Sequence, residues 1–402
     1  MRVGLISFHS FFQPGGVKRH VFGLYKEFKK RGIYTKIIVP RRNISENYGK
    51  DVILLGTSFS MKFSGSQSDF DINFNPLAIE NVIGKEKFDI LHFHNFGFPS
   101  ALQILASFAA MNTLNILTFH ANIEGSKFLK TFPEFLYILN KICQWKIDGI
   151  IAVSPLNLKV FKDYRGPKKV IPNGIDLEEF NPKVPKIKKF LDGKINILFV
   201  GRIEERKGLI YLLKAFKILE KTPAIKQMGG VRLIVVGEGE LKKDCKDYVK
   251  RNNLKEVRFE GEISGKELAS YYTSSDIFCS PAIFGESFGM VLLEAMASGK
   301  PVVAFANEGY KEFLKDKKSA FLVPNKDYKA LAKKIEILIK NPQLREKMGQ
   351  LAIKEAQKYS WQKIADQILN FYDFCRKNKK YKKQEFSFEK ILKKITNQDF
   401  LK

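Results

Sequence analysis

The chain has 402 residues, more than one hydrophobic core usually organises, so two or three domains are expected and a single small module is excluded. Hydrophobic residues make up 45% of the chain, with only 15 Pro and 28 Gly, which excludes a disordered or collagen-like protein. The formal net charge of +27 favours an anionic partner: a phosphorylated small molecule, an acidic lipid surface or nucleic acid.

The four cysteines are widely spaced and include no Cys-x-x-Cys pair, which argues against a zinc site or disulfide framework and indicates a reducing cytoplasm. The first apolar run, Val3 to Phe8, is too short for a secretory signal and predicts a β-strand. No stretch approaches the ~18 to 20 apolar residues of a membrane-spanning helix. Any membrane contact is therefore expected to be peripheral.

Short apolar runs alternate with helical patterns through the first half of the chain, beginning with an amphipathic stretch at Gly16 to Lys30. The runs after the first strand are Ile33 to Val39, Phe88 to Phe93, Ile116 to Phe119 and Gly149 to Val153. This alternation predicts a parallel sheet with crossover helices. A passage rich in Pro, Asn, Gly and Lys, Ile171 to Lys189, breaks the pattern and predicts a domain boundary.

The alternation then resumes, which predicts a second doubly wound α/β half. We expect an N-terminal Rossmann-like domain at 1–180, a C-terminal one at 190–360, a helix at 361–377 and a basic amphipathic tail at 378–402. Ligands of open α/β sheets bind at the carboxyl ends of the strands. Two such halves facing each other would leave a cleft at those ends.

All five histidines fall in the first 120 residues, and His9, His92, His94 and His120 lie at or just after predicted strand ends. A polar, titratable cleft wall follows from that topology. His20, inside a helix, is expected to pack locally. His92 and His94 resemble a metal pair, but no third ligand is evident, so no metal site is predicted. His120 is the best candidate for contact with a reacting group.

Two segments have the composition of phosphate-binding loops. Gln13 to Val17 places a Gly pair between a strand and a helix, which fits a phosphate site and a plain tight turn equally well. GRIEERKG places Arg202 directly after a strand and Lys207 at the start of the next helix, which suits a diphosphate. The alternative for Glu204 to Lys207 is an ordinary solvated charge cluster.

The strongest signal is SPAIFGESFGMVLLEAMASGKPVVA, in which Ser287 can cap a helix running from Phe288 to Ser298. Glu294 follows Glu286 by eight residues, a span of roughly 12 Å if fully helical. That span matches a nucleoside diphosphate sugar, with one carboxylate on the sugar and the other on the ribose. Glu294 lies in VLLEAMA, where an unpaired charge would cost several kcal/mol, so we expect it to have a partner.

Asp69-Phe70-Asp71 resembles the D-x-D triplet with which other transferases hold a metal-bound nucleotide. Such triplets arise by chance, and no strand is predicted before this one. We expect it to lie in a loop.

In order and spacing, several segments resemble the retaining glycosyltransferases of family four over residues 1 to 377. They include PGGVKRHV, FDILHFHN, TFHAN, IPNGID, GRIEERKG, VVGEGE and Glu286 to Glu294. The resemblance implies the α/β GT-B fold, two facing Rossmann-like doubly wound domains with a C-terminal crossover helix. Within the family the N-terminal half is most similar to phosphatidylinositol α-mannosyltransferases.

The resemblance implies a metal-independent hexosyltransferase that moves a sugar, with mannose as one candidate, from a GDP- or UDP-linked donor to an acceptor hydroxyl with retention. No cofactor is implied. The catalytic residues would be His120, Glu286, Arg202 and Lys207. The donor would be bound by Gly16, Arg202, Lys207, Glu286, Phe288, Gly289, Met290 and Glu294.

The chain departs from the phosphatidylinositol-using members between Ser68 and Phe88, where it lacks their arginines and is nearly neutral or acidic. In the tail, Phe388, Ile391, Leu392 and Ile395 fall on one helical face beside a cluster of lysines. We hypothesise that the tail lies on anionic lipid, which would make the protein cytoplasmic and peripheral at the inner face of the plasma membrane. The alternative is a solvated, charged terminus.

Three functions therefore stand beside one another. The first is sugar transfer to a lipid-linked or membrane-proximal acceptor, and the second is transfer to a soluble sugar or sugar phosphate. The third, ranked low, is non-catalytic nucleic-acid binding through the basic charge. The basic residues are dispersed and the paired carboxylates would repel nucleic acid, so no nucleic-acid partner is expected.

Overall fold

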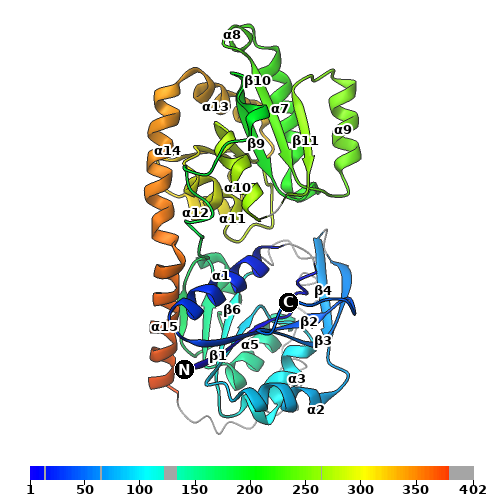
Figure 1. Cartoon of the computed structure of the whole chain (residues 1–402), viewed down its shortest axis with the longest axis vertical. Coiled ribbons are helices and arrows are strands. Elements are labelled where there is room, and N and C mark those ends of the chain that lie inside the picture. Colours follow the sequence, from blue (N-terminus) through cyan, green and yellow to red (C-terminus); the bar gives the residue numbers. More distant parts are fainter. Residues whose placement is uncertain (13–14, 64–65, 122–133, 264, 380–402) are drawn as a thin grey trace, which may run out of the picture. The chain divides into compact units, whose positions relative to one another are not determined.

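The computed structural model describes residues 1–12, 15–63, 66–121, 134–263 and 265–379. The described residues divide into two compact units: unit 1 comprises those up to 172 and those from 364 to 379, and unit 2 comprises those from 173 to 363 (Figure 1). Within these described ranges, none of the helices is both long and apolar enough to cross a membrane.

Unit 1 is built on an eight-stranded sheet in the order β4-β3-β2-β1-β5-β6-β7-β8, parallel except for the β3–β4 pair. Its strands are β1 (Arg2–Ser7), β2 (Tyr34–Arg41), β3 (Val52–Phe63), β4 (Ser66–Ile72), β5 (Ile90–His94), β6 (Leu114–Phe119), β7 (Gly149–Ala152) and β8 (Lys168–Val170). The central strands are buried on both faces, as their continuous apolar runs require.

The helices of unit 1 lie over this sheet because each has one apolar face. In α1 (Gly16–Lys30) the buried positions His20, Leu24 and Phe28 recur at helical spacing. The other described helical segments are α2 (Pro76–Ile79), η1 (Glu80–Gly84), α3 (Ser100–Ala106), η2 (Phe108–Ala110), α5 (Glu134–Lys146), α6 (Pro155–Leu158) and η3 (Lys159–Phe161). Helix α15 (Trp361–Lys377) begins in unit 2 and has most of its length in unit 1.

Unit 2 is built on a six-stranded parallel sheet in the order β11-β10-β9-β12-β13-β14. Its strands are β9 (Ile195–Val200), β10 (Val231–Val236), β11 (Val257–Gly261), β12 (Ile277–Ser280), β13 (Val302–Phe305) and β14 (Ala320–Val323). Its helical segments are η4 (Lys188–Phe190), η5 (Glu205–Lys207), α7 (Leu209–Lys221), α8 (Pro223–Gln227), α9 (Lys242–Arg251), α10 (Gly265–Ser274), α11 (Met290–Ala297), α12 (Glu308–Leu314), α13 (Tyr328–Lys340), α14 (Pro342–Ala356) and η6 (Gln357–Tyr359). Leu212, Phe216 and Ile335 are among the side chains that fill its core.

Each sheet has one place where the strand order reverses. In unit 1 the first strand, β1, lies between β2 and β5, and in unit 2 β9 lies between β10 and β12. The connections that leave the two neighbouring strands at such a switch point diverge, and the opening between them is where doubly wound sheets bind ligands. The fold therefore singles out the segments after β1 and β5, and those after β9 and β12.

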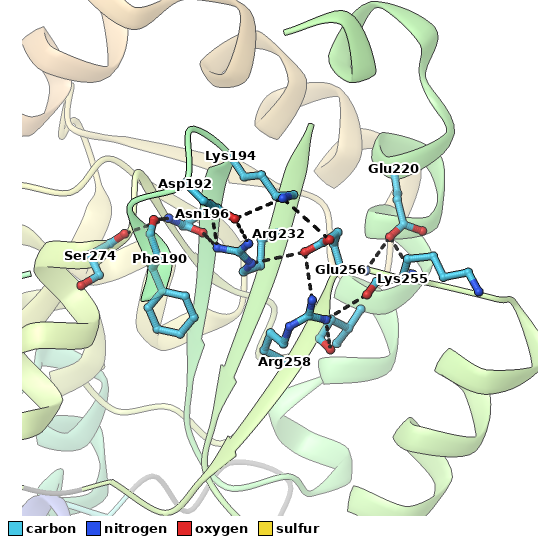
Figure 2. A network of polar contacts seen from close by, with 11 residues as sticks. Phe190, Asp192, Lys194, Asn196, Glu220, Arg232, Lys255, Glu256, Arg258 and Ser274 are labelled. Atoms are coloured by element: carbon cyan, nitrogen blue, oxygen red, sulfur yellow. Dashed lines mark hydrogen bonds and ion pairs between the residues drawn. The ribbon is translucent and has the colours of Figure 1, made fainter. Parts of the chain in front are cut away.

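A buried arginine organises the opposite end of the unit 2 sheet, where the strands begin (Figure 2). The Arg232 guanidinium pairs with Asp192 and contacts Glu256 at 3.3 Å, and its carbon Cζ lies 5.6 Å from the Phe190 ring centroid. Next to it, Asn196 donates to the Phe190 carbonyl at 2.9 Å. This network fastens the segment that leads into β9.

The division between the units falls at Pro172–Asn173, inside the passage Ile171 to Lys189. Residues 173–180, which the sequence assigned to the first domain, belong to unit 2 because their contacts are there. The Ile175 amide donates to the Tyr359 carbonyl at 2.8 Å, and the Phe180 ring meets Tyr272 edge-on at 5.8 Å. Residues 380–402, with the predicted lipid-binding face, lie outside the described residues.

The prediction of a loop at residues 69–71 was wrong. Asp69-Phe70-Asp71, expected in a loop, belongs to strand β4, which pairs antiparallel with β3 through Phe59–Phe70 and Ser58–Asp71. The alternation from Ser66 to Ile72 fits an edge strand, but its polar composition hid the signal. Asp71 is fully buried beside Gly97, so it is part of the packing of unit 1.

Candidate functional site

In unit 2, two basic residues after β9 contact a carboxylate that follows the neighbouring strand β12. The Lys207 ammonium lies 2.6 Å from Glu286 Oε1, and Arg206 Nη1 lies 2.9 Å from the same oxygen. Arg206 also pairs with Glu204. All four side chains are largely buried. The contact crosses the switch point of the sheet, where a ligand of this fold is expected.

The charges in this cluster change one another's protonation equilibria. Burial would raise the pKa of Glu286, but the ammonium of Lys207 and the guanidinium of Arg206 outweigh that effect and leave the pKa lowered. Burial lowers the pKa of Lys207 against the opposing charge of Glu286. Burial likewise lowers the pKa of Arg202, which is about half exposed and contacts Glu204 at 3.5 Å. The cluster thus gathers three cations around two buried carboxylates, Glu286 and Glu204.

Hydrogen bonds from three other segments of unit 2 hold the loop that carries Glu286. Asn307 donates to the Ala282 carbonyl at 2.9 Å, Asn325 donates to the Ile283 carbonyl at 3.0 Å, and the Ile283 amide donates to the Arg206 carbonyl at 2.8 Å. A Cβ on Gly309 would come within 2.0 Å of the Glu286 carbonyl oxygen. Only glycine at that position lets α12 approach the loop so closely.

Helix α11 begins at Met290, two residues later than the sequence indicated. Its N-cap is Gly289, at φ +86, and the predicted cap residue Ser287 stands outside the helix. A Cβ on Gly289 would meet Tyr310 Cε1 at 2.6 Å, so the left-handed turn needs glycine for both conformation and space. Phe288 packs against Phe313, with their ring centroids 4.5 Å apart. This contact fixes the backbone just before α11, next to the free N–H groups at the start of that helix.

Glu294 has the partner that its apolar surroundings required. It is fully buried on α11, and the Tyr272 hydroxyl donates to its Oε2 at 2.8 Å. Because α11 starts only at Met290, the roughly 12 Å estimate for a continuous helix from Glu286 does not apply. The structure therefore brings Glu286 together with Lys207 and Arg206, and places Glu294 in a separate contact with Tyr272.

In unit 1, the switch point holds a second polar cluster. The Asn95 amide nitrogen donates to His9 Nε2 at 2.9 Å, and Asn95 Oδ1 accepts the backbone N–H of His120 at 2.7 Å. Asn95 has φ +66, a left-handed conformation that asparagine adopts more readily than most residues. One side chain therefore ties the ends of β1, β5 and β6 together and sets the backbone of His120.

Three imidazoles converge beside that backbone. His94 Nδ1 lies 3.2 Å from His120 Nε2, and the His20 ring centroid lies 4.6 Å from that of His120 and 5.2 Å from that of His94. One nitrogen from each of the three lies within 4.8 Å of the others, a set that could hold a metal ion. The sequence paired His92 with His94 instead. His20 was missed as a member of the cluster, although its 20-24-28 spacing with Leu24 and Phe28 marks it as buried.

The segment expected to meet a phosphate in unit 1 lies at the start of α1. Gly16 is the first residue of that helix and is exposed, while residues 13–14 lie outside the described residues. The Lys18 ammonium donates to the Phe11 carbonyl at 2.7 Å, and burial lowers its pKa. Arg206 was not predicted as a site residue, and in the sequence it appeared only in the alternative of a solvated charge cluster. The short segment Glu205–Lys207 has no periodicity that would mark it.

The two halves match two descriptions of known families. Residues 14–179 match the family model described as Glycosyltransferase Family 4, and residues 181–355 match Glycosyl transferases group 1. The phosphatidyl-myo-inositol mannosyltransferase of Mycobacterium leprae is 31% identical over 382 residues, covering 93% of this chain and 96% of that protein. That of Mycolicibacterium smegmatis is also 31% identical, covering 93% and 94%.

Among solved structures, sucrose-phosphate synthase from Thermosynechococcus elongatus superimposes with a TM-score of 0.75 at 21% identity, covering 94% of this chain and all of that one. Anabaena HepE, in complex with UDP and glucose, gives 0.70 at 19% identity, covering 93% and 99%. These likenesses show the fold, and the sequence relatives show the family. The chain is a glycosyltransferase that belongs to glycosyltransferase family four and has the GT-B fold.

Proposed function

We propose that the protein is a retaining, metal-independent hexosyltransferase that moves mannose from a nucleotide diphosphate sugar to a hydroxyl of a lipid-linked or membrane-proximal acceptor. The observation that carries the proposal is the contact of Lys207 and Arg206 with Glu286 at the unit 2 switch point. The 31% identity to phosphatidyl-myo-inositol mannosyltransferases supports the choice of sugar and acceptor.

In this proposal the donor diphosphate binds Lys207, Arg206 and Arg202, which form charge-assisted hydrogen bonds to phosphate. The backbone amides at the start of α11, from Met290 and from Phe288 and Gly289 just before it, add dipoles of the right sign. Bound phosphate competes with Glu286 for the cations, which leaves that carboxylate to accept hydrogen bonds from the sugar hydroxyls. Glu294 is assigned to the ribose, with Tyr272 as its partner in the absence of donor.

The reaction forms a bond from the acceptor oxygen to the anomeric carbon and breaks the bond from that carbon to the phosphate oxygen. The acceptor proton passes to an oxygen of the leaving phosphate. Negative charge develops on that phosphate, where Lys207 and the arginines stabilise it. In unit 1, His120 contacts the sugar beside the reaction centre, and Gly16 allows close approach of the helix start. Positioning and electrostatics supply the catalysis.

A soluble acceptor is the second candidate. It is favoured by the segment from Ser68 to Phe88, which lacks the arginines of the phosphatidylinositol-using members. The two candidates differ in the product. Purified protein is incubated with labelled GDP-mannose or UDP-glucose and either phospholipid vesicles or free sugars, and the label is partitioned between water and organic solvent. Label in the organic phase supports the lipid acceptor, and label only in water supports the soluble one.

The lysine-rich tail is proposed to hold the protein on the inner face of the plasma membrane, in the cytoplasm. Each basic residue near an anionic surface contributes about 1 kcal/mol. Deleting residues 378–402 should abolish sedimentation with phosphatidylglycerol vesicles at low salt, while donor affinity stays unchanged. Equal sedimentation of the truncated and full chains would reject this role.

A further inference from the structure

Helix α15 places the side chain of Tyr372 against His92 of strand β5 in unit 1. Tyr372 is fully buried, and its ring meets Phe28 at 6.3 Å and His92 at 5.6 Å, both edge-on. Its hydroxyl lies 2.6 Å from His92 Nδ1. The helix packs tightly here, since a Cβ on Gly149 would come within 2.4 Å of Cys375 Sγ. The tyrosine is therefore fixed in place from several sides.

His92 is held on both of its ring nitrogens. On the side opposite Tyr372, its Nε2 lies 2.6 Å from Thr118 Oγ1. The side chains of His92 and Tyr372 are both fully buried, which favours their neutral forms. A neutral imidazole has one donor and one acceptor nitrogen. One of its two partners must therefore donate to the ring and the other must accept from it. If Tyr372 donates to Nδ1, then Nε2 donates to Thr118. In the only other arrangement, Nδ1 donates to Tyr372 and Thr118 donates to Nε2.

The fixed ring of His92 lies against His94, which in turn contacts His120. The His92 and His94 ring centroids are 4.3 Å apart, with the planes 30° from parallel. His94 is fully buried as well, which favours its neutral form. Its Nδ1 faces His120 Nε2 at 3.2 Å. Because only one of these two nitrogens can carry the shared proton, the tautomer of His94 determines that of His120.

We infer that Tyr372, by fixing the His92 ring against which His94 packs, is a positioning residue that sets the ring orientation of His94 and of its partner His120. The series Tyr372, His92, His94 and His120 is called the buried relay. Its catalytic consequence rests on the proposed role of His120, whereas its structural consequence does not. The relay gives the C-terminal helix a function besides packing, because α15 supplies the hydroxyl that starts it.

The test removes one oxygen atom. Tyr372→Phe keeps the ring and deletes the hydroxyl, and Tyr164→Phe is the matched control. Tyr164 is equally buried in unit 1, and its hydroxyl donates to the Ile147 carbonyl at 3.0 Å, away from the relay. Ring nitrogen shifts of His120 are read by long-range ¹H–¹⁵N NMR, with His120→Gln to assign them. Transfer kinetics and thermal unfolding are measured on the same full-length proteins.

We expect Tyr372→Phe to change the His120 nitrogen shifts and to lower kcat about tenfold with little change in donor KM, as a loss of orientation does. Tyr164→Phe should change neither. Unchanged His120 shifts in Tyr372→Phe would overturn the inference. Changed shifts in a chain whose activity does not need His120 would uphold the relay and refute the proposed role of His120.

Should Tyr372→Phe fail to fold, Thr118→Val breaks the relay from the other side of His92. It removes the hydroxyl that Nε2 contacts and retains the shape of the side chain. The same change in the His120 shifts is expected, and its absence would again overturn the inference.

Discussion

Replacing Glu286 tests whether the buried ion cluster around it stabilises unit 2, as a surface ion pair would not. In Glu286→Gln the side chain keeps its size but loses the charge that faces Lys207 at 2.6 Å and Arg206 at 2.9 Å. Removing one partner of a buried ion pair costs ~3–5 kcal/mol, because the opposite charge stays buried without compensation. The amide oxygen still accepts one hydrogen bond, so a loss of about 3 kcal/mol is expected.

For a unit of the size of residues 173–363, that loss corresponds to a fall in Tm of roughly 6 to 12 °C. Differential scanning calorimetry and guanidinium unfolding of the full chain measure it. The control is Glu308→Gln, which breaks the exposed pair with Lys311 and should change stability by less than about 0.5 kcal/mol. If Glu286→Gln unfolds at the same temperature as the wild type, the cluster does not stabilise unit 2 and the reasoning is wrong.

Three further outcomes follow from the contacts of Glu286, from the Arg232 network and from the three-histidine cluster. Because the pKa of Glu286 is lowered in the folded chain, its stabilisation is present above the unfolded value of about 4.3 and is lost as the pH falls through the folded value. The stability difference between wild type and Glu286→Gln should therefore hold from pH 8 to 6 and shrink below pH 4, and a difference constant down to pH 2 would contradict this. Arg232→Met, which removes the centre of the network in Figure 2, should cost about 2 kcal/mol in guanidinium unfolding. It should leave donor affinity unchanged because Arg232 lies where the strands begin, so weakened donor binding would refute that assignment. Dialysis against EDTA should leave the transfer rate unchanged, whereas loss of activity together with stoichiometric zinc would make the three-histidine cluster a metal site.

The alternation of apolar runs was sufficient to predict two parallel α/β units, because strands buried on both faces leave continuous hydrophobic segments. The segment from Ser66 to Ile72 escaped this reasoning: it is an edge strand whose polar residues do not form such a run. The start of α11 was misplaced for a different reason. A left-handed glycine at 289, required by the nearby Tyr310 ring, displaces the cap, and that tertiary contact cannot be read from the serine two residues earlier.

The sequence predicted several residues of the candidate site, but only some of the contacts between them. Strand ends marked Lys207 and Glu286 as members of one site, since β9 and β12 are neighbours at the switch point. The equal involvement of Arg206 depends on which face of η5 turns inward, and a three-residue turn carries no periodicity to show it. The apolar sequence around Glu294 implied that its carboxylate has a hydrogen-bond partner, but it did not identify that partner. Tyr272 comes from α10, which is brought to α11 only by the packing of unit 2.

The measurement that tests the central claim is isothermal titration calorimetry of GDP and UDP into the wild type and Lys207→Met, with Lys311→Met as the exposed control. If Lys207 holds the donor diphosphate, its loss removes a charge-assisted hydrogen bond of about 1.5–3 kcal/mol. The Kd should then rise roughly 10- to 100-fold. The control should bind as the wild type does. Equal nucleotide affinity in Lys207→Met and wild type would contradict the assignment of the unit 2 switch point as the donor site.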